Sequence, residues 1–538
     1  MEKIHNIISE KRREIVCIII LLLFSVSFNQ YYGFQGINPI DSFFSFNTGY
    51  DILNGHYPFK DYWTITGPFI DFTVAILFKI FGVSWSIYVL YASIFNFIFT
   101  IATFYILYKF GLNLYYCFLY AFLLSILAYP SAGTPYTDHQ NSFLSIIAVY
   151  CFILALKTNL KFYWFVLPII IGISFLTKQA PTGHIFLIIS LLSSIHFIFN
   201  FNTEKIIYGI IGSIFFISIF LIILWIGKVP IINFVDQYIL FPISLAGNRL
   251  EFIFPLEFSR VILRFKLLHL ASLTLIFVCI KKIFENYKYL KSNEFLIIAS
   301  LLGSTYALIA HQLMTINGIF IFFTIPILSG FSHIYYLKYF KNKKYIHFLL
   351  IALSISSTVY YGIKYIDKRD FMDLRKVSME DSIDAKIFDE KLSGLKWKTT
   401  LYPENPQSEI SNLKEAISII RNDNRKKMIV TDYQFISVIL SLYDYSPNKF
   451  WHVGVGYPPG KEAPKGTTYS GNKYFKNYKK FFIKKLKEGE IEVVYTIKPL
   501  FGDRDVLREI ISKNCYSREI VTDIAYAETI IPCEDLNN

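Results

Sequence analysis

Residues 206–226 read IIYGIIGSIFFISIFLIILWI, an apolar run without one charged side chain. A helix of about 20 apolar residues crosses the hydrocarbon core of a bilayer and leaves no backbone polar group unpaired there. Similar runs occupy residues 15–31, 84–108, 114–130, 139–156, 162–178, 183–200, 262–280, 294–312, 318–337 and 346–364. The sequence therefore predicts a polytopic α-helical membrane protein with about eleven spanning helices.

Composition divides the chain in two. Of its 538 residues, 54% are hydrophobic and only 17% are charged, whereas soluble domains carry about 25% charged residues. The apolar runs lie in residues 1–365, and residues 366–538 are ordinary polar sequence. We therefore predict a transmembrane domain over 1–365 and a soluble domain over 366–538.

The soluble domain alternates helical and strand patterns. Helices are predicted over residues 411–427, 434–441 and 473–488, and strands over 428–431 and 491–496, with two more strands flanking Cys515 and Cys533. This pattern is typical of a small α/β domain. It contains no nucleophile elbow, P-loop or metal signature.

The net charge of +13 has two possible explanations. The protein binds nucleic acid, or its lysines and arginines collect in short loops on one face of the membrane. The second reading is favoured, because most loop cations fall on one side: Lys3, Lys11, Arg12, Arg13, Lys109, Lys157, Lys161, Lys205, Lys281, Lys282, Lys288, Lys291, Lys338, Lys341, Lys343 and Lys344. That side is cytoplasmic by the positive-inside rule. We expect a bacterial inner-membrane protein with a cytoplasmic N-terminus and an extracytoplasmic C-terminal domain, and no nucleic-acid partner.

The cysteines are consistent with this orientation. Cys17, Cys117, Cys151 and Cys279 lie inside apolar runs and are expected to be buried. Cys515 and Cys533 lie in the polar tail. If the tail is outside the cytoplasm, these two cysteines could form a disulfide.

Polar residues collect in the loops predicted to face outward. The first loop, 29–83, carries Asp41, Asp51, Lys60 and Asp61, and ends in a stretch, 67–81, that we predict to be a helix lying in the membrane interface. Later outward loops carry Asp138, His139, Lys178, Gln179, Arg249, Arg260 and His311. Polar groups at membrane depth are costly and usually functional, so these residues are candidates for a site.

The first outward loop resembles that of the GT-C glycosyltransferases, in particular the bacterial protein mannosyltransferase and aminoarabinose transferase members. The matching features are Asp41, the segment Gly49–Leu53, the segment Gly55–Pro58, Asp61 and the turn Gly67–Pro68. Asp138 in the second outward loop and Thr177–Gln179 after the fifth run match further features of the family. The chain departs from the family at Ser42, where many relatives carry Glu, and at Phe44 and Thr66, where the aminoarabinose transferase members carry Arg and Lys.

The resemblance implies an inverting glycosyltransferase that takes its sugar from a polyprenyl-phosphate donor in the outer leaflet. The acceptor would be a cell-envelope glycan, lipid or protein. Asp41 would be the catalytic base, since an acceptor hydroxyl needs a carboxylate within hydrogen-bond reach. Lys60, Lys178, Arg249 and Arg260 would stabilise the leaving phosphate. Asp61, Asp138, His139, Gln179 and His311 would complete substrate binding.

Other roles for these residues stay open. Asp41 and Asp138 are also plausible helix N-caps, and Asp51 and Asp61 plausible cap, turn or solvated loop residues. His139 and His311 fit structural hydrogen bonding, and Lys178 fits a simple interface anchor. A divalent cation on Asp41 and Asp138 is an alternative, although some relatives need none.

Two other functions are alternatives for this chain. A lipid-linked glycan flippase or transporter would be expected to show internal repeats and charges at span centres, and neither is evident. A glycan polymerase or ligase would be expected to show outward clusters of Arg and His, which are sparse in this chain.

Overall fold

The computed structural model describes residues 2–128, 133–254, 256–340, 345–442, 445–460, 471–498, 500 and 505–537. The predicted inward lysines Lys341, Lys343 and Lys344 lie outside these ranges. The chain divides into two compact units. The first unit comprises residues 1–33, 92–220 and 251–371, and the second comprises residues 34–91, 221–250 and 372–538.

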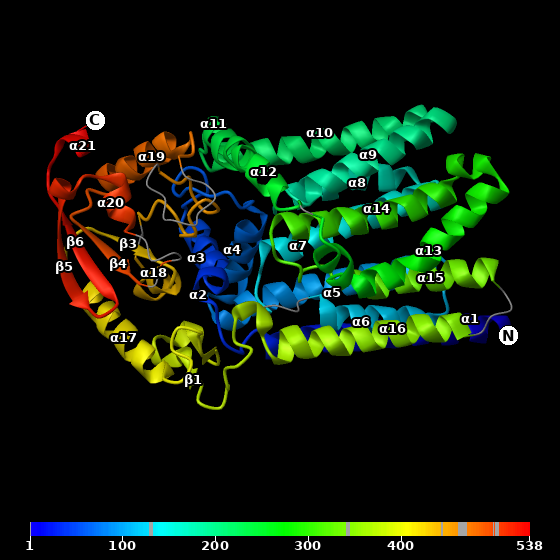
Figure 1. The fold of residues 1–538 in the computed structure, drawn as a ribbon, viewed down its shortest axis with the longest axis horizontal. Coiled ribbons are helices and arrows are strands. Elements are labelled where there is room, and N and C mark those ends of the chain that lie inside the picture. The colour runs from blue at the N-terminus through cyan, green and yellow to red at the C-terminus, as the bar shows by residue number, and fades with distance from the viewer. Residues whose placement is uncertain are drawn as a thin grey trace. The chain divides into compact units, whose positions relative to one another are not determined.

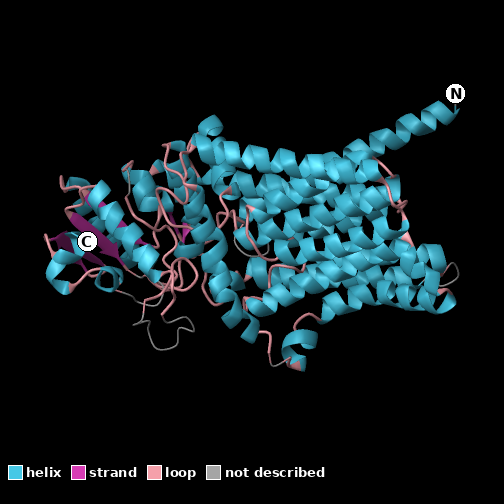
Figure 2. Ribbon diagram, turned by 90° about the horizontal axis from the view of Figure 1, so that it is seen from above, coloured by secondary structure: helices cyan, strands magenta, loops and turns pink. Residues whose placement is uncertain are grey.

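The first unit is a bundle of long helices that lie side by side (Figures 1 and 2). Its core is built from apolar side chains of many helices, among them Leu21, Tyr120, Phe152, Leu308 and Phe331. The helices are α1 (Glu2–Tyr32), α5 (Trp85–Lys109), α6 (Leu114–Leu127), α7 (Thr137–Thr158), α8 (Lys161–Phe175), α9 (Thr182–Phe199), α10 (Thr203–Ile226), α13 (Lys266–Glu285), α14 (Asn293–Met314), α15 (Thr324–Tyr339) and α16 (Tyr345–Gly362).

Each predicted spanning range overlaps one of these helices. Within the described residues, 8 helices are long and apolar enough to cross a membrane by length and composition. The helices at the predicted spans 114–130, 162–178 and 318–337 are shorter: α6 has 14 residues, α8 has 15 and α15 has 16. The chain is thus a polytopic α-helical membrane protein, as its sequence predicts.

The second unit is built around a mixed sheet of four strands in the order β3-β4-β6-β5. The strands are β3 (Lys427–Thr431), β4 (Val493–Ile497), β5 (Tyr516–Thr522) and β6 (Ala525–Ile530), and a separate pair is formed by β1 (Ile383–Asp384) and β2 (Lys396–Trp397). Strands β3 and β4 run parallel, and the other neighbours run antiparallel. The predicted α/β domain in the tail is confirmed.

Helices of three chain segments complete the second unit. They are α2 (Pro39–Ser42), α3 (Phe44–Leu53), α4 (Phe69–Phe81), α11 (Ile231–Phe234), α12 (Phe241–Glu251), α17 (Pro406–Asn422), α18 (Phe435–Leu440), α19 (Phe475–Glu488), α20 (Val506–Ile510) and α21 (Glu534–Asn537). Trp63 of the first outward loop and Phe241 of α12 share a core with Val430 of β3 and Tyr478 of α19. The predicted boundary at residue 365 is close to where the chain leaves the first unit, but two segments assigned to the transmembrane domain pack with the tail.

Two sequence-based expectations about the elements need correction. The helix expected from residue 411 begins at Pro406, because Asn405 caps it by accepting a hydrogen bond from the Ser408 N–H and proline fits the first helical position. The stretch 227–261, expected as a loop, contains α11, a π-helical turn over Val235–Leu240 and α12. Its apolar residues are numerous enough to form buried helical faces despite the interruption at Pro242.

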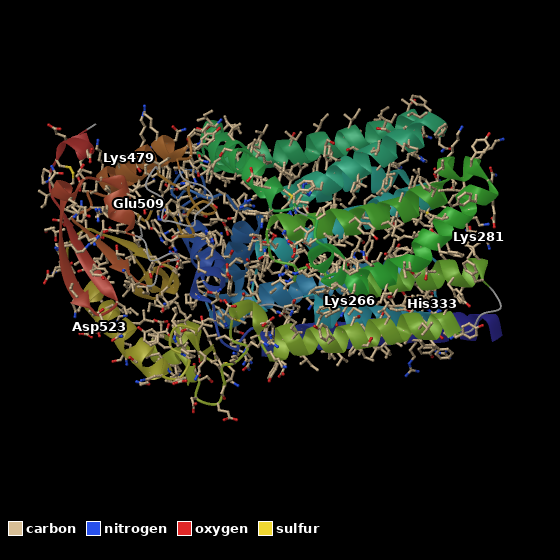
Figure 3. The ribbon with its side chains drawn as sticks, in the orientation of Figure 1. Lys266, Lys281, His333, Lys479, Glu509 and Asp523 are labelled. Carbon is tan, nitrogen blue, oxygen red and sulfur yellow. A yellow bond between two sulfur atoms is a disulfide. The ribbon has the colours of Figure 1, made fainter. Side chains whose placement is uncertain are left out.

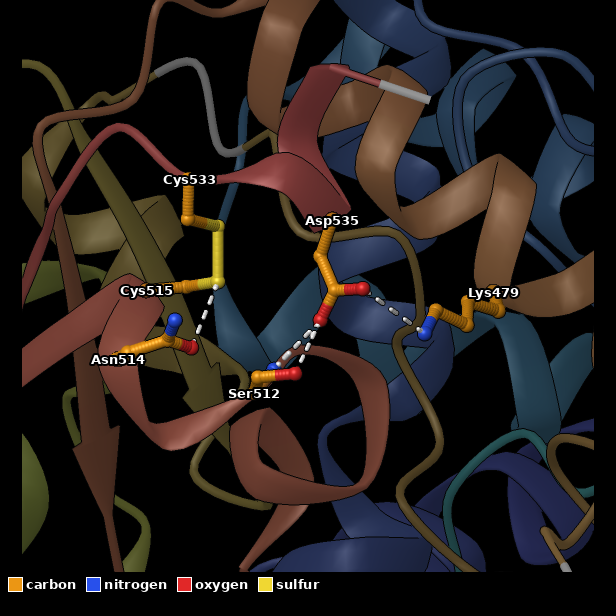
Figure 4. The surroundings of a disulfide bond; sticks show 6 residues. All are labelled: Lys479, Ser512, Asn514, Cys515, Cys533 and Asp535. Carbon is orange, nitrogen blue, oxygen red and sulfur yellow. Dashed lines mark hydrogen bonds and ion pairs between the residues drawn. A yellow bond between two sulfur atoms is a disulfide. The ribbon is translucent and has the colours of Figure 1, made fainter.

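The end of the chain is fastened by a disulfide between Cys515 and Cys533 (Figure 4). Beside it, Asp535 accepts hydrogen bonds from the Ser512 backbone N–H at 2.8 Å and from the Ser512 hydroxyl at 2.6 Å. Lys479 of α19 lies 4.0 Å from the other Asp535 oxygen. These contacts hold the last residues against the sheet domain.

Candidate functional site

Three of the predicted site residues meet in the first unit. Lys178 Nζ donates to both carboxylate oxygens of Asp138, at 2.7 Å and 2.6 Å. His311 Nε2 lies 3.1 Å from Asp138 Oδ1. The Asp138 side chain is 5% exposed and that of His311 is 2% exposed, whereas the Lys178 side chain is 20% exposed. A buried carboxylate is therefore neutralised by one cation that still reaches the surface.

Helix ends place these three side chains. Asp138 lies in the first turn of α7, His311 in the last turn of α14, and Lys178 just after the end of α8. The chain between α8 and α9 is held by Asn141, whose side-chain amide donates to the carbonyls of Ser174 at 2.8 Å and Lys178 at 2.6 Å. Asn141 lies one turn beyond Asp138 on α7, so the same helix fixes both the backbone and the ammonium of Lys178.

Asp138 is not the N-cap of its helix. The cap position of α7 is Tyr136, which makes no side-chain cap hydrogen bond, and the carboxylate of Asp138 is occupied by Lys178 and His311 instead. The Lys178 ammonium is ion-paired with Asp138, and its place at the membrane interface stays a prediction. His311 does make a structural hydrogen bond, one of the two roles that its sequence position allows.

His139 and Gln179 flank this cluster in sequence but are placed differently. The His139 ring is fully buried, with its centroid 4.6 Å from that of Phe320 in a T-shaped contact. The loop that carries Phe320 is fixed by Gln312, whose side-chain oxygen accepts the backbone N–H groups of Gly318 at 2.9 Å and Ile319 at 3.1 Å. Gln179 is partly exposed in the turn before α9. Substrate binding by these two residues stays a prediction.

Asp41 belongs to the second unit, in the single turn of α2. One carboxylate oxygen accepts a hydrogen bond from the side-chain amide of Asn38 at 3.1 Å, and the side chain is partly exposed. The N-cap position of α2 is Asn38 and that of α3 is Phe43, so the reading of Asp41 as a cap is wrong. Its predicted role as a base stays a prediction.

Lys60 and Asp61 also lie in the second unit. Asp61 accepts the Tyr57 backbone N–H at 2.8 Å and lies 3.5 Å from Lys485 Nζ on α19. Lys60 Nζ is 3.8 Å from Asp61 and donates to the Gly227 carbonyl at 3.4 Å. Asp61 is thus a turn residue, as its sequence position allows. It is also ion-paired with Lys485 of the tail.

The two predicted outer arginines lie in different units. Arg249 is on α12 in the second unit and is partly exposed. Arg260 is in a π-helical turn, Ser259–Leu263, in the first unit, where its guanidinium donates to the Phe252 carbonyl at 2.6 Å. Phosphate binding by either residue stays a prediction.

Sequence reasoning missed one buried ion pair. Asp51, expected to be a cap, turn or solvated residue, is 5% exposed and lies 3.2 Å from Lys449 Nζ, which is 1% exposed. The pair joins the first outward loop to the tail within the second unit. No local pattern signals it, because the partners lie far apart in the sequence.

A second buried carboxyl group was missed in α4. Asp71 accepts a hydrogen bond from the Thr48 hydroxyl at 2.6 Å and one from the Tyr62 hydroxyl at 3.4 Å. Burial raises the pKa of Asp71 to about 7. The helix predicted over 67–81 is present, with Asp71, Val74 and Phe78 on its buried side and Ile76, Ile80 and Phe81 exposed.

No group of three or more His, Cys, Asp or Glu side chains suited to a metal ion occurs among the residues that the structure describes. Asp41 and Asp138, the predicted metal pair, belong to different units. A cation held by both of them stays a prediction.

The comparisons with known proteins give a likeness to solved structures. No family model and no curated protein matches the chain. Among solved structures, the crystal structure of ArnT from Cupriavidus metallidurans bound to undecaprenyl phosphate is similar with a TM-score of 0.41 and 10% sequence identity. The match covers 95% of this chain and 98% of that one.

Proposed function

We propose that the chain is a membrane glycosyltransferase that transfers a sugar from a polyprenyl-phosphate donor to a cell-envelope acceptor. The proposal rests first on the GT-C-like pattern of the first outward loop, from Asp41 to Pro68. It also rests on a bundle of helices that suits a lipid-borne donor, because such a donor stays within the bilayer.

The observation that carries the proposal is the buried cluster of Asp138, Lys178 and His311 at the ends of α7, α8 and α14. Ionisable side chains at membrane depth are costly and usually functional. An ammonium has three N–H donors, and two of those of Lys178 reach Asp138. The third is available to a phosphate oxygen, and the 20% exposure of Lys178 leaves a route to it.

The proposed reaction is a single displacement at the anomeric carbon. The acceptor hydroxyl attacks this carbon while its proton passes to the carboxylate of Asp41, and the bond from the carbon to the phosphate oxygen breaks with inversion. The electron pair of that bond stays on the polyprenyl phosphate. Lys178 stabilises the charge that develops there, and Asp138 and His311 orient the ammonium.

We place this reaction on the outer face of a bacterial inner membrane. The bias of Lys and Arg toward the opposite loops supports this placement. The disulfide between Cys515 and Cys533 supports an extracytoplasmic tail, because disulfides persist in oxidising compartments.

The test is sugar transfer by purified full-length protein. Radiolabelled polyprenyl-phosphate sugars and membrane acceptors are incubated with wild type, with Asp41→Asn and with Asp523→Asn. Asp523, labelled in Figure 3, is exposed in the turn between β5 and β6 and provides a matched control. We expect Asp41→Asn to slow transfer by about 10²–10⁴-fold and Asp523→Asn to be unchanged. Equal rates for both variants would remove Asp41 as the base.

A further inference from the structure

Lys398 is a buried cation in the second unit. It is 1% exposed, and among the described residues its ammonium makes no hydrogen bond or ion pair. Burying a charge without a partner is costly. The other two most buried lysines follow this rule, since Lys449 lies 3.2 Å from Asp51 and Lys485 lies 2.9 Å from Glu488.

The backbone around Lys398 runs beside the segment that leads to Asp41. Gln35 pairs with Lys396 in a parallel bridge. The Gly36 N–H donates to the Lys396 carbonyl at 3.1 Å, and the Ile37 N–H donates to the Lys398 carbonyl at 3.0 Å. The turn α2, which contains Asp41, follows two residues after Ile37. Lys396 and Lys398 are therefore both paired through their backbones with the segment that leads into α2.

The neighbours of Lys398 determine which side of the strand it occupies. The Trp397 indole N–H and the Thr399 hydroxyl both donate to Glu409 Oε2, at 3.0 Å and 2.9 Å. Successive side chains of extended backbone point to opposite sides. Lys398 consequently faces away from Glu409, which could otherwise have paired with it.

We propose that Lys398 binds an anionic phosphate group at the segment that leads into α2. The proposal rests on the proposed function, in which a phosphate ester is the leaving group of the base-assisted step. A buried ammonium without a carboxylate partner suits a site that is completed by its ligand, because the phosphate would supply both the missing charge and the missing hydrogen-bond acceptors. The phosphate comes from the lipid donor or from free phosphate, and the experiment distinguishes these sources.

The experiment measures binding by full-length protein in nanodiscs. The ligands are a polyprenyl monophosphate, the matching uncharged polyprenol and inorganic phosphate. The variants are Lys398→Met, Lys398→Arg and Lys396→Met. Lys396 is the matched control, because it is exposed and lies two residues before Lys398 in the same extended segment. Gel filtration and the midpoint of thermal unfolding check that each variant is folded.

We expect Lys398→Met to weaken binding of the polyprenyl phosphate by about 10- to 100-fold, since a hydrogen bond to a charged group is lost. Lys398→Arg should retain most of the affinity, and Lys396→Met should match wild type. Binding of polyprenol should be the same in all four proteins. If Lys398→Met weakens the binding of inorganic phosphate but not that of the polyprenyl phosphate, the site is assigned to free phosphate. Unchanged phosphate binding by Lys398→Met overturns the proposal.

A measurement on wild type covers the case in which Lys398→Met does not fold. Reductive methylation of Lys398, followed by mass spectrometry, should be slowed by polyprenyl phosphate and not by polyprenol. Equal rates with both lipids overturn the proposal. Failure of the proposed function would be seen in a different measurement. Wild type would then transfer no sugar, whatever the phosphate binding of the Lys398 variants.

Discussion

Asp138 is the residue on which the buried cluster of the first unit depends. Its carboxylate is in contact with both Lys178 and His311, whereas Lys178 and His311 reach each other only through it. Removing one partner of a buried ion pair is more damaging than removing both, because it leaves an uncompensated charge behind.

Asp138→Asn should therefore lower the free energy of unfolding by about 3 kcal/mol, and Asp138→Asn combined with Lys178→Met should cost less than the sum of the two single changes. The measurement is the midpoint of thermal unfolding in detergent. Glu204→Gln is the control, since the pair of Glu204 with Lys161 is exposed and should give no measurable change. Additive effects at Asp138 and Lys178 would show that the two residues are not coupled.

Asp71 gives a prediction about pH. Its pKa is raised by burial from 3.8 to about 7, so the folded state holds a proton that the unfolded state releases at lower pH. The contribution of Asp71 to the stability of the folded state should be largest below about pH 4 and should fall as the pH rises toward 7, by on the order of 4 kcal/mol.

Asp71→Asn should remove this part of the pH dependence while keeping the contacts with Thr48 and Tyr62. Thermal unfolding midpoints measured from pH 4 to pH 8 for Asp71→Asn, Asp523→Asn and wild type test it. If Asp71→Asn keeps the slope of wild type, the group titrates at its ordinary pKa.

At the scale of elements, α8 and α10 approach each other through glycine. A Cβ built on Gly212 of α10 would lie 2.1 Å from the Phe165 carbonyl oxygen of α8, whereas one built on Gly209 would have only the Trp164 carbonyl oxygen nearby, at 3.8 Å. Small residues let membrane helices pack closely.

Gly212→Ala should force α8 and α10 apart and destabilise the protein by about 1–3 kcal/mol, because the colliding atom belongs to the backbone and cannot rotate away. Gly209→Ala, one turn earlier on the same helix, should be close to neutral. The comparison of their unfolding midpoints is the measurement. Equal midpoints would mean that the close approach is absent.

Much of this architecture follows from local pattern. Apolar length predicts the helices of the bundle, and short runs rich in apolar residues predict β3 and β4 to within two residues at either end. Element ends were less predictable where local signals compete. The polar stretch before Ser411 resembles a loop, although Asn405–Pro406 is a good helix start, and the run from Ile231 to Glu251 is interrupted by Asp236 and Pro242.

For the whole molecule, orientation is the expectation that most needs a test. Single cysteines at Asn54 in the first outward loop and Asp523 in the tail should react with a membrane-impermeant thiol reagent added to intact cells, since both positions are exposed. Asn286→Cys, between α13 and α14, should react only after the cells are opened. Labelling of Asn286→Cys alone in intact cells would reverse the orientation.

Long-range pairing marks the limit of sequence reasoning for the site. Asp138, Lys178 and His311 could be predicted to share one face, because consecutive spans return to the same side of a membrane. Their contact could not, since it depends on the packing of α7, α8 and α14. The pair of Asp51 with Lys449 and the burial of Lys398 have no local signature at all, because packing between distant segments creates them.

The most direct test of the account is the identity of the sugar donor. Purified protein is mixed with unlabelled acceptor membranes and either the lipid-linked sugars extracted from labelled cells or a set of labelled nucleotide sugars. The account predicts that label moves to the acceptor only from the lipid-linked pool, with an equal amount of polyprenyl phosphate released. Transfer from a nucleotide sugar, or release without transfer to any acceptor, would contradict it.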